Sequence, residues 1–499
     1  MGKVMIIGID GLDSLLLSKF EEDLPNFRKI KENSPNIKMK SVFPPDSPTA
    51  WASIYTGKNP ANHGIISFKD PFTPSKVCEY LGTDISGKTF WDIAGKEGKK
   101  VCIIFPHLGY PVWPVNGVMV GRTTEVDIRE FDIQTYPSYI SKEYDLSGLK
   151  PMTSFPVNIG NIIEPTKKLI LNEVKFGVNL LKDMEWDLYF IYFSSLDNIE
   201  HLFWMYYDED DPEYKENNPY KDIIPQFYKF YDKYVIGVFL KHLDHDTTLI
   251  VLSDHGHAMR PYKIVNVNEV LRRNGFLQSK ISNKISYYYL LEVLRKKLVN
   301  TINKYRFIGK LTSIFLRYFP NSLNIYTKTT PISWEKTIAY LSDPSGGLKA
   351  YSYAGIKIKK DNMNDDKYEK IRTQLIKLLY NIKDPTTSEN IVEWAVKREE
   401  LYRGKYLHKY PDILFKLRDD WGVGWELNCP LFSKSLSHKI HSGNHRQESA
   451  VFLIYGNKNK NIRKNITLMD VAPTILDILE VKVNFEFDGS SIFRFDEDT

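Results

Sequence analysis

The amino-acid sequence predicts an α/β fold with a mostly parallel central sheet, flanked by helices and carrying a helical insertion. Short apolar segments typical of buried strands recur along the chain, and segments with helical periodicity lie between them. This alternation favours a parallel sheet covered by helices. Several apolar segments end in Asp or His, and ligands of such sheets bind beyond the carboxyl ends of the strands.

The elements follow one another along the whole chain. We expect buried strands at residues 4–9, 186–193, 247–252 and 450–455. We expect helices at residues 165–181, 223–243, 265–274, 368–382 and 470–479. The last of these helices is predicted to pack back on the sheet, and residues 336–430 are predicted to be mixed α/β.

One segment interrupts this pattern, and it sets the predicted domain organisation. Residues 1–277 and 336–499 form one α/β catalytic domain, and residues 278–335 form a helical insertion. Within the insertion, residues 285–319 are rich in Lys and Arg with interleaved apolar side chains, which indicates amphipathic helices. Three interpretations stay open: a structural hairpin packed on the domain, a cap over a ligand pocket and a contact with a membrane surface.

The composition excludes several classes of protein. Hydrophobic residues make up 42% and charged residues 26% of the 499, as in globular proteins, and the net charge of +5 requires no nucleic-acid partner. The three cysteines form no CxxC pair, which argues against a disulfide framework. No apolar run reaches the about 18 residues of a transmembrane helix, and Asp10 interrupts the N-terminal apolar run too early for a signal peptide. We therefore expect a cytoplasmic protein without a transmembrane segment.

Six side chains at strand ends and helix starts are candidate metal ligands. They are Asp10, Asp197, His201, Asp254, His255 and His445. Carboxylate oxygen and imidazole nitrogen are the ligands that Zn²⁺ and similar ions accept. Asp197 and His201 are four residues apart, so a helix places both on one face. Six ligands shared between two ions leave open positions on each, as catalysis requires.

A candidate nucleophile lies in residues 41–57, which predict a strand, a turn and a helix. Ser47 is expected at the helix N-cap and Pro48 in the first helical position. A hydroxyl there lies at the positive end of the helix dipole and, bound to a metal, can attack phosphorus. The pattern alone is equally consistent with Ser47 acting only as the cap. Thr49 is the rival nucleophile.

Taken in order, these motifs resemble those of the alkaline phosphatase superfamily. The resemblance is carried by Gly8-Ile9-Asp10-Gly11, by Ser47 ahead of residues 56–65, by Asp197 to His201, by Ser253-Asp254-His255-Gly256, by Gly443 to Arg446 and by Phe487-Asp488-Gly489. Among its members, the chain is most similar to the type I phosphodiesterase/nucleotide pyrophosphatase branch, in its archaeal and bacterial phosphohydrolase or phosphomutase group. The resemblance covers residues 1–260 and 335–495.

The resemblance implies an alkaline phosphatase-like fold and a site with two divalent ions, zinc or else manganese. Asp197, His201 and His445 would hold one ion. The other would be held by Asp10, Asp254, His255 and the oxygen of Ser47, the position that the family's spacing gives to the nucleophile. Thr49 falls where the family often has proline.

Two departures bear on the substrate. Phe68 stands where nucleotide pyrophosphatases have an asparagine that contacts phosphate, and the arginine of the sulfatase pattern is missing after Ser47. Lys69 and Arg122 are candidate replacement donors, and His257 is a further candidate substrate contact.

The predicted function is therefore that of a metal-dependent phosphohydrolase, more specifically a phosphodiesterase, with a covalent phosphoserine intermediate. Its substrate would be a small-molecule or a lipid- or glycan-linked phosphate ester. A phosphomutase or phosphotransferase of the same superfamily is the alternative. A non-catalytic metal-binding scaffold is disfavoured, since structural zinc sites are normally closed. The sequence leaves the substrate and the oligomeric state open.

Overall fold

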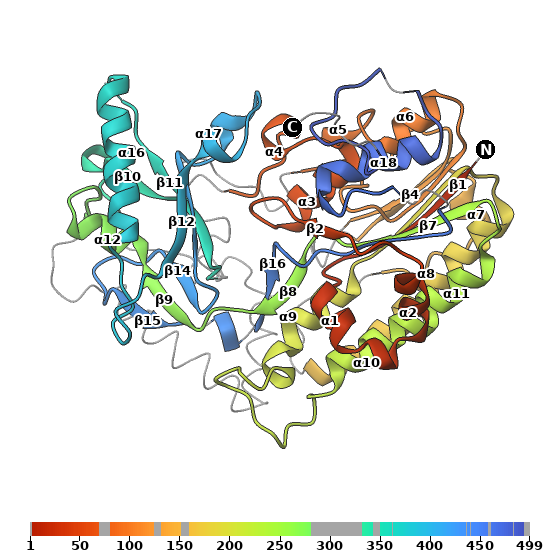
Figure 1. Ribbon diagram of the computed structural model, residues 1–499, viewed down its shortest axis with the longest axis horizontal. Coiled ribbons are helices and arrows are strands. Elements are labelled where there is room, and N and C mark those ends of the chain that lie inside the picture. Colours follow the sequence, from red (N-terminus) through yellow and green to blue (C-terminus); the bar gives the residue numbers. More distant parts are fainter. Residues whose placement is uncertain are drawn as a thin grey trace.

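The fold is built around one large sheet, as predicted, with a second lobe beside it (Figure 1). The computed structural model describes residues 2–68, 80–123, 131–150, 159–280, 332–342, 350–361, 363–435, 437–439, 441–457, 461–482 and 484–493. All statements about the structure refer to these residues. Residues 281–331, which make up most of the predicted insertion, lie outside the described residues, and so does Lys69. At the margins of that insertion, Ser279 and Ile332 form an isolated bridge.

The central sheet has seven strands. In spatial order they are β17 (Phe452–Tyr455), β7 (Thr247–Leu252), β1 (Lys3–Ile9), β6 (Leu188–Phe193), β3 (Val101–Ile104), β4 (Gly117–Arg122) and β5 (Ile133–Tyr136). The five inner strands are parallel, which confirms a mostly parallel sheet. The strand predicted at residues 450–455 is present as β17, but it runs antiparallel to β7 at the edge of the sheet and not parallel as expected.

The register of the three central strands decides where the polar residues emerge. Ile9 pairs with Phe193, and Gly8 pairs with Leu252. The strands therefore end at the same level, and the residues that follow them lie side by side. The strands themselves are buried on both faces, which their near-continuous apolar sequences require.

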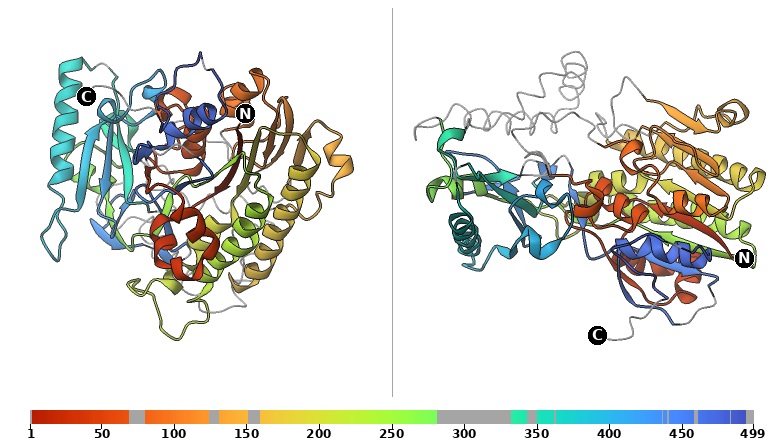
Figure 2. Two further views of the ribbon diagram at one scale, coloured as in Figure 1. Left: turned by 45° about the vertical axis from the view of Figure 1, so that its right-hand side comes forward. Right: turned by 90° about the horizontal axis from the view of Figure 1, so that it is seen from above.

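Helices cover both faces of the sheet. One face packs with α1 (Ser14–Lys19), α2 (Pro25–Glu32), α8 (Ile163–Asp183), α9 (Ser195–Tyr207), α10 (Ile223–Tyr231) and α11 (Gly237–Phe239). The other packs with α3 (Ser47–Thr56), α6 (Phe90–Lys96) and α18 (Val471–Ile478), near the shorter α4 (Pro60–His63) and α5 (Gly82–Ile85) (Figures 1 and 2). The short helix α7 (Ile140–Glu143) follows β5. The predicted return of the chain's last helix to the sheet is confirmed in α18.

The second lobe lies within residues 263–435. It holds the antiparallel sheet β10 (Ala339–Ser342), β11 (Tyr353–Ile358), β13 (Ile413–Leu417) and β12 (Val392–Lys397), the small sheet β14 (Trp421–Gly424), β9 (Lys263–Asn266) and β15 (Phe432–Lys434), and the helices α12 (Val267–Arg273), α16 (Asp365–Tyr380) and α17 (Arg398–Leu401). Apart from α17, whose Leu401 packs against another cluster, these elements share their own hydrophobic core. The helix expected at residues 265–274 begins at Val267, because β9 extends to Asn266.

Two short ribbons complete the structure. The antiparallel pair β8 (Gly256–Met259) and β16 (Gly443–Arg446) lies between the two lobes (Figure 1). The parallel pair β2 (Lys38–Lys40) and β18 (Asn465–Thr467) lies beside the central sheet. Among the described residues, no helix combines the length and the apolar character needed to cross a bilayer.

Candidate active site

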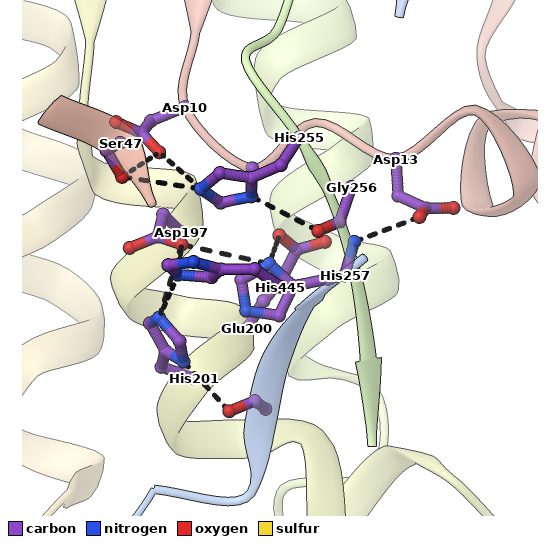
Figure 3. Close-up of polar contacts among 12 residues, drawn as sticks. Asp10, Asp13, Ser47, Asp197, Glu200, His201, His255, Gly256, His257 and His445 are labelled. Carbon is purple, nitrogen blue, oxygen red and sulfur yellow. Dashed lines mark hydrogen bonds and ion pairs between the residues drawn. The ribbon is translucent and has the colours of Figure 1, made fainter. Parts of the chain in front are cut away.

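The six predicted ligands and Ser47 meet at the carboxyl edge of the central sheet. Figure 3 labels all of them except Asp254. Asp10 follows β1, the pair Asp254-His255 follows β7, and α9 carries Asp197 and His201 directly after β6. His445 comes from β16, which pairs with β8 so that His445 lies opposite His257. The loops after β1 and β7 therefore supply two carboxylates and one imidazole, α9 supplies one of each, and the ribbon supplies the last imidazole.

The first ligand group gathers Asp10, Asp254, His255 and Ser47. The His255 Nε2 lies 3.5 Å from Asp10 Oδ1 and 3.2 Å from Asp254 Oδ2. The Ser47 Oγ lies 3.3 Å from His255 Nε2 and 3.4 Å from Asp10 Oδ1. The other oxygen of Asp10 accepts hydrogen bonds from Tyr192 and Trp51, so its first oxygen faces the group.

The second ligand group gathers Asp197, His201 and His445. The Asp197 Oδ1 lies 3.4 Å from His201 Nε2 and 3.6 Å from His445 Nε2. The two Nε2 atoms are 3.0 Å apart. The i,i+4 spacing within α9 thus places Asp197 and His201 together, as the sequence predicted.

The histidine tautomers provide a test of whether these groups fit cations. The Nδ1 of His201 faces the Gly443 carbonyl at 2.9 Å, and the Nδ1 of His445 faces the Pro45 carbonyl at 2.9 Å. Because a carbonyl oxygen can only accept, each Nδ1 carries the proton and each Nε2 presents a lone pair. The Nδ1 of His255 faces the Gly256 carbonyl in the same way, at 3.1 Å. Lone pairs and carboxylate oxygens thus converge in both groups, which is the arrangement that a divalent cation requires.

The electrostatics of the first group agree with this conclusion. Burial, and for Asp10 also the charge of Asp254, raises the pKa of both carboxyl groups from 3.8 to about 7. Burial lowers the pKa of His255, which therefore stays neutral and able to bind a cation. Two buried carboxylates this close are stable in their charged form only with a positive charge beside them.

The start of α3 determines which hydroxyl faces the ligands. Asp46 occupies the N-cap and Ser47 the first helical position, so the predicted N-cap was wrong by one residue. Thr49 is fully buried and its Oγ1 lies 3.1 Å from Ser67 Oγ. Of the two rival hydroxyls, only that of Ser47 lies against the ligand group.

The three candidate substrate contacts differ in position: one lies beside the second ligand group, one lies elsewhere, and one is outside the described residues. His257 is fully buried beside the second group, with its Nδ1 3.2 Å from Glu200 Oε2 and 3.8 Å from Asp197 Oδ1. The structure does not bring Arg122 to the site: this buried guanidinium forms an ion pair with Glu173 at 2.7 Å and donates to the Leu149 carbonyl. Lys69 lies outside the described residues.

Several residues of the site escaped sequence reasoning. Glu200 is fully buried and its Oε1 accepts a hydrogen bond from Tyr228. Arg260 is fully buried and donates to the Gly443 carbonyl, which fixes β16 beside α9. Glu200 directly precedes the predicted ligand His201, and Arg260 directly follows β8, the strand after Asp254-His255. Their positions beside predicted ligands were the available signal.

The fold and the two candidate ligand groups agree with the alkaline phosphatase-like arrangement expected from the sequence. A family model described as type I phosphodiesterase / nucleotide pyrophosphatase matches residues 4–441, and the chain belongs to this family. The protein is accordingly a phosphoric ester hydrolase of a metal-dependent family. The search of curated proteins found no match.

Solved structures share the fold over almost the whole chain. Human ectonucleotide pyrophosphatase/phosphodiesterase 5 is 13% identical, with a TM-score of 0.51 and coverage of 98% of this chain and 97% of its own. An inactive variant of the murine protein, solved in complex with AMP, is 14% identical, with a TM-score of 0.51 and 98% coverage of both chains. Phosphonoacetate hydrolase from Sinorhizobium meliloti 1021, solved with phosphonoformate, is 14% identical, with a TM-score of 0.54 and coverage of 96% and 95%.

Proposed function

We propose that this protein is a two-metal phosphodiesterase that uses Ser47 as its nucleophile. The observation that carries the proposal is the position of the Ser47 Oγ, 3.4 Å from Asp10 Oδ1 and 3.3 Å from His255 Nε2. A hydroxyl that contacts two ligand side chains of one cation group is within reach of that cation. Thr49, the rival, is buried away from the group.

The chemistry divides between the cations and the chain. Two divalent ions, zinc or manganese, held by the two ligand groups would supply the positive charge that makes the Ser47 hydroxyl acidic and neutralises the phosphate. The Ser47 Oγ forms a bond to phosphorus and the ester oxygen of the leaving alcohol departs. Water then attacks the resulting phosphodiester of Ser47, which releases a phosphate monoester and restores the hydroxyl. Ser47 is the first residue of α3, and the positive end of a helix dipole favours an anion nearby.

The proposed substrate class follows from the small number of other side chains that could donate a hydrogen bond to a substrate phosphate. Phe68 is buried against Tyr410 and offers no hydrogen bond to a phosphate oxygen. We therefore propose a small-molecule phosphate ester, with a lipid- or glycan-linked ester as the broader form of the same substrate, rather than a dinucleotide. A cytoplasmic location remains a prediction; it is supported by the low number of cysteines, three in 499 residues with no CxxC pair.

The test is a comparison of Ser47→Ala with Thr49→Ala on an aryl phosphodiester, with zinc and manganese supplied in parallel. Ser47→Ala should lose about 10³-fold or more of kcat while it still binds metal, and Thr49→Ala should lose far less. Acid quenching during turnover should trap phosphate on the peptide that contains Ser47. Turnover by Ser47→Ala at the wild-type rate would refute the proposal.

The same assay separates the alternative function. A phosphomutase or phosphotransferase forms the same phosphoserine but returns the phosphoryl group to an acceptor hydroxyl. Sugar phosphates and alcohol acceptors are therefore included, and the products are identified. Transfer that exceeds release to water would favour the alternative.

A further inference from the structure

The segment Phe43 to Asp46 connects the second lobe to the active site. It lies between β2 and α3, immediately before Ser47. Three tyrosine side chains of the second lobe reach it: Tyr353 from β11, Tyr402 directly after α17 and Tyr410 just before β13. We call these three residues the tyrosine clamp.

The clamp holds the segment by hydrogen bonds at both ends. The Phe43 N–H donates to the Tyr402 hydroxyl at 2.7 Å, and the Tyr410 hydroxyl donates to the Phe43 carbonyl at 2.8 Å. The Tyr353 hydroxyl donates to Asp46 Oδ1 at 3.3 Å. Both backbone groups of Phe43 and the N-cap residue of α3 are therefore bonded to the second lobe.

Packing reinforces these bonds. The Phe43 ring meets Tyr353 and Trp394 edge to face, with ring centroids 5.5 and 4.8 Å apart. Phe43, Tyr353 and Tyr410 belong to one buried apolar cluster. Burial raises the pKa of Tyr353 and Tyr410 well above the usual value, so both remain neutral donors. An aromatic anchor with two satisfied backbone groups has little freedom to shift.

The clamped segment touches both ligand groups. The Pro45 carbonyl accepts from His445 Nδ1 and thereby orients the Nε2 toward Asp197 and His201. The next residue after Asp46 is Ser47, whose Oγ faces Asp10 and His255. A displacement of this segment would therefore move the nucleophile and one metal ligand together.

We propose that the second lobe positions Ser47 and His445 through the tyrosine clamp. The inference rests on the proposed function, because it takes Ser47 as the attacking group. Tyr353, Tyr402 and Tyr410 are positioning residues, since each acts through the segment that it holds. The second lobe is then part of the catalytic apparatus.

The experiment removes hydroxyls while it keeps the rings. Tyr353→Phe, Tyr410→Phe and the double variant are assayed on an aryl phosphodiester, more than about 15 °C below their melting temperatures. Because small misplacements of reacting groups cost up to about 100-fold in rate, kcat should fall by about 10-fold in each single variant and further in the double variant. KM should stay within about twofold, since the phosphate-binding groups are retained. The double variant should also bind its weaker metal ion with lower affinity, because His445 loses its orientation.

The matched control is Tyr368→Phe. Tyr368 is a buried tyrosine of the same lobe whose hydroxyl donates to Asp412 Oδ1 at 2.6 Å, with no contact to the clamped segment. It should lower the melting temperature and leave kcat unchanged. The proposal is overturned if the clamp variants keep wild-type kcat, or if Tyr368→Phe loses as much. Should the double variant fail to fold, Tyr402→Phe decides in its place by the same criteria. If Ser47→Ala is active, the nucleophile assignment fails separately, since the clamp is judged from its own variants.

Discussion

At the level of single residues, two backbone carbonyls decide what His201 and His445 can bind. Gly443 and Pro45 each accept from an Nδ1–H, and this leaves two lone pairs 3.0 Å apart beside the carboxylate of Asp197. Two lone pairs that face each other beside a carboxylate favour a cation between them. This arrangement supports the proposal of a metal site, of which the sequence could indicate only the ligand spacing.

His445→Ala removes one of the three ligands of the second group. We expect the variant to keep the ion of the first group and to lose the ion of the second group. The kcat should fall by about 100-fold or more, because the second ion no longer offers a coordination position to the substrate. Metal content after gel filtration, measured by atomic emission, checks this. His408→Ala, at an exposed histidine whose only described hydrogen bond is to the Lys405 carbonyl, should bind both ions. Retention of both ions by His445→Ala would contradict the assignment.

Arg122 shows how a charged residue can be misassigned from sequence. Its ion pair with Glu173 joins β4 to α8 inside the fold, and its guanidinium also lies over the Phe105 ring. Arg122→Met should destabilise the protein by about 3–5 kcal/mol, because Glu173 is left buried without its partner. The folded enzyme should keep its kcat and KM. Denaturant unfolding and kinetics at low temperature measure the two effects, and a raised KM in the folded protein would restore a substrate role to Arg122.

At the level of elements, sequence reasoning succeeded where the signal was local. The strand at residues 247–252 was predicted with its observed ends, since a β-branched run stops at Ser253. It failed where pairing depends on distant parts of the chain. The four residues of β16 are a strand only because they pair with β8, and neither stretch is apolar enough to predict one. The ligand His445 was therefore identified by a motif, while its place on a ribbon was not.

The turn after β1 gives a test at this level. Gly11 has a φ of +73°, and a Cβ there would lie 3.1 Å from Glu200 Oε2 and 3.2 Å from the Asp197 Cα. Gly11→Ala should therefore lower stability, and also kcat, because α9 carries Asp197 and must move. Gly87→Ala is the matched control, with a φ of +78° and open space around the new Cβ. It should cost about 1 kcal/mol of backbone strain and leave kcat unchanged. Equal losses of kcat in the two variants would refute the contact argument.

At the level of the whole molecule, the two lobes were not separable from sequence. The prediction of mixed α/β structure in residues 336–430 gave no sign that these residues form a separate core together with residues 265–277. Such a core depends on packing between strands and helices that lie up to about 160 residues apart, which periodicity within one segment cannot reveal. The candidate ligand groups were predictable because most of their residues follow strands, whereas the tyrosines that hold the nucleophile segment come from the second lobe and pack in a cluster of their own.

The stability of the whole protein should depend on pH and metal together. Without metal, Asp10 and Asp254 have a pKa of about 7 in the folded state, against 3.8 when unfolded. Between about pH 4 and 7 the folded protein then binds more protons than the unfolded chain, so the metal-free form loses stability as pH rises. Bound zinc holds both carboxylates ionised, and protons compete with it less as pH rises. The difference in melting temperature between the zinc-loaded and the chelated protein should therefore grow from pH 5 to pH 8.

Differential scanning fluorimetry across this range, with zinc or with a chelator, measures that difference. Asp10→Asn provides the control, because it removes one buried charge and one ligand at once. In chelator at pH 8 this variant should melt at a higher temperature than the wild type, since Asp254 no longer faces a second carboxylate. With zinc it should gain less than the wild type at every pH. A wild-type difference that is constant from pH 5 to pH 8 would mean that these two carboxylates do not control the binding of metal, and the first ligand group would have to be reassigned.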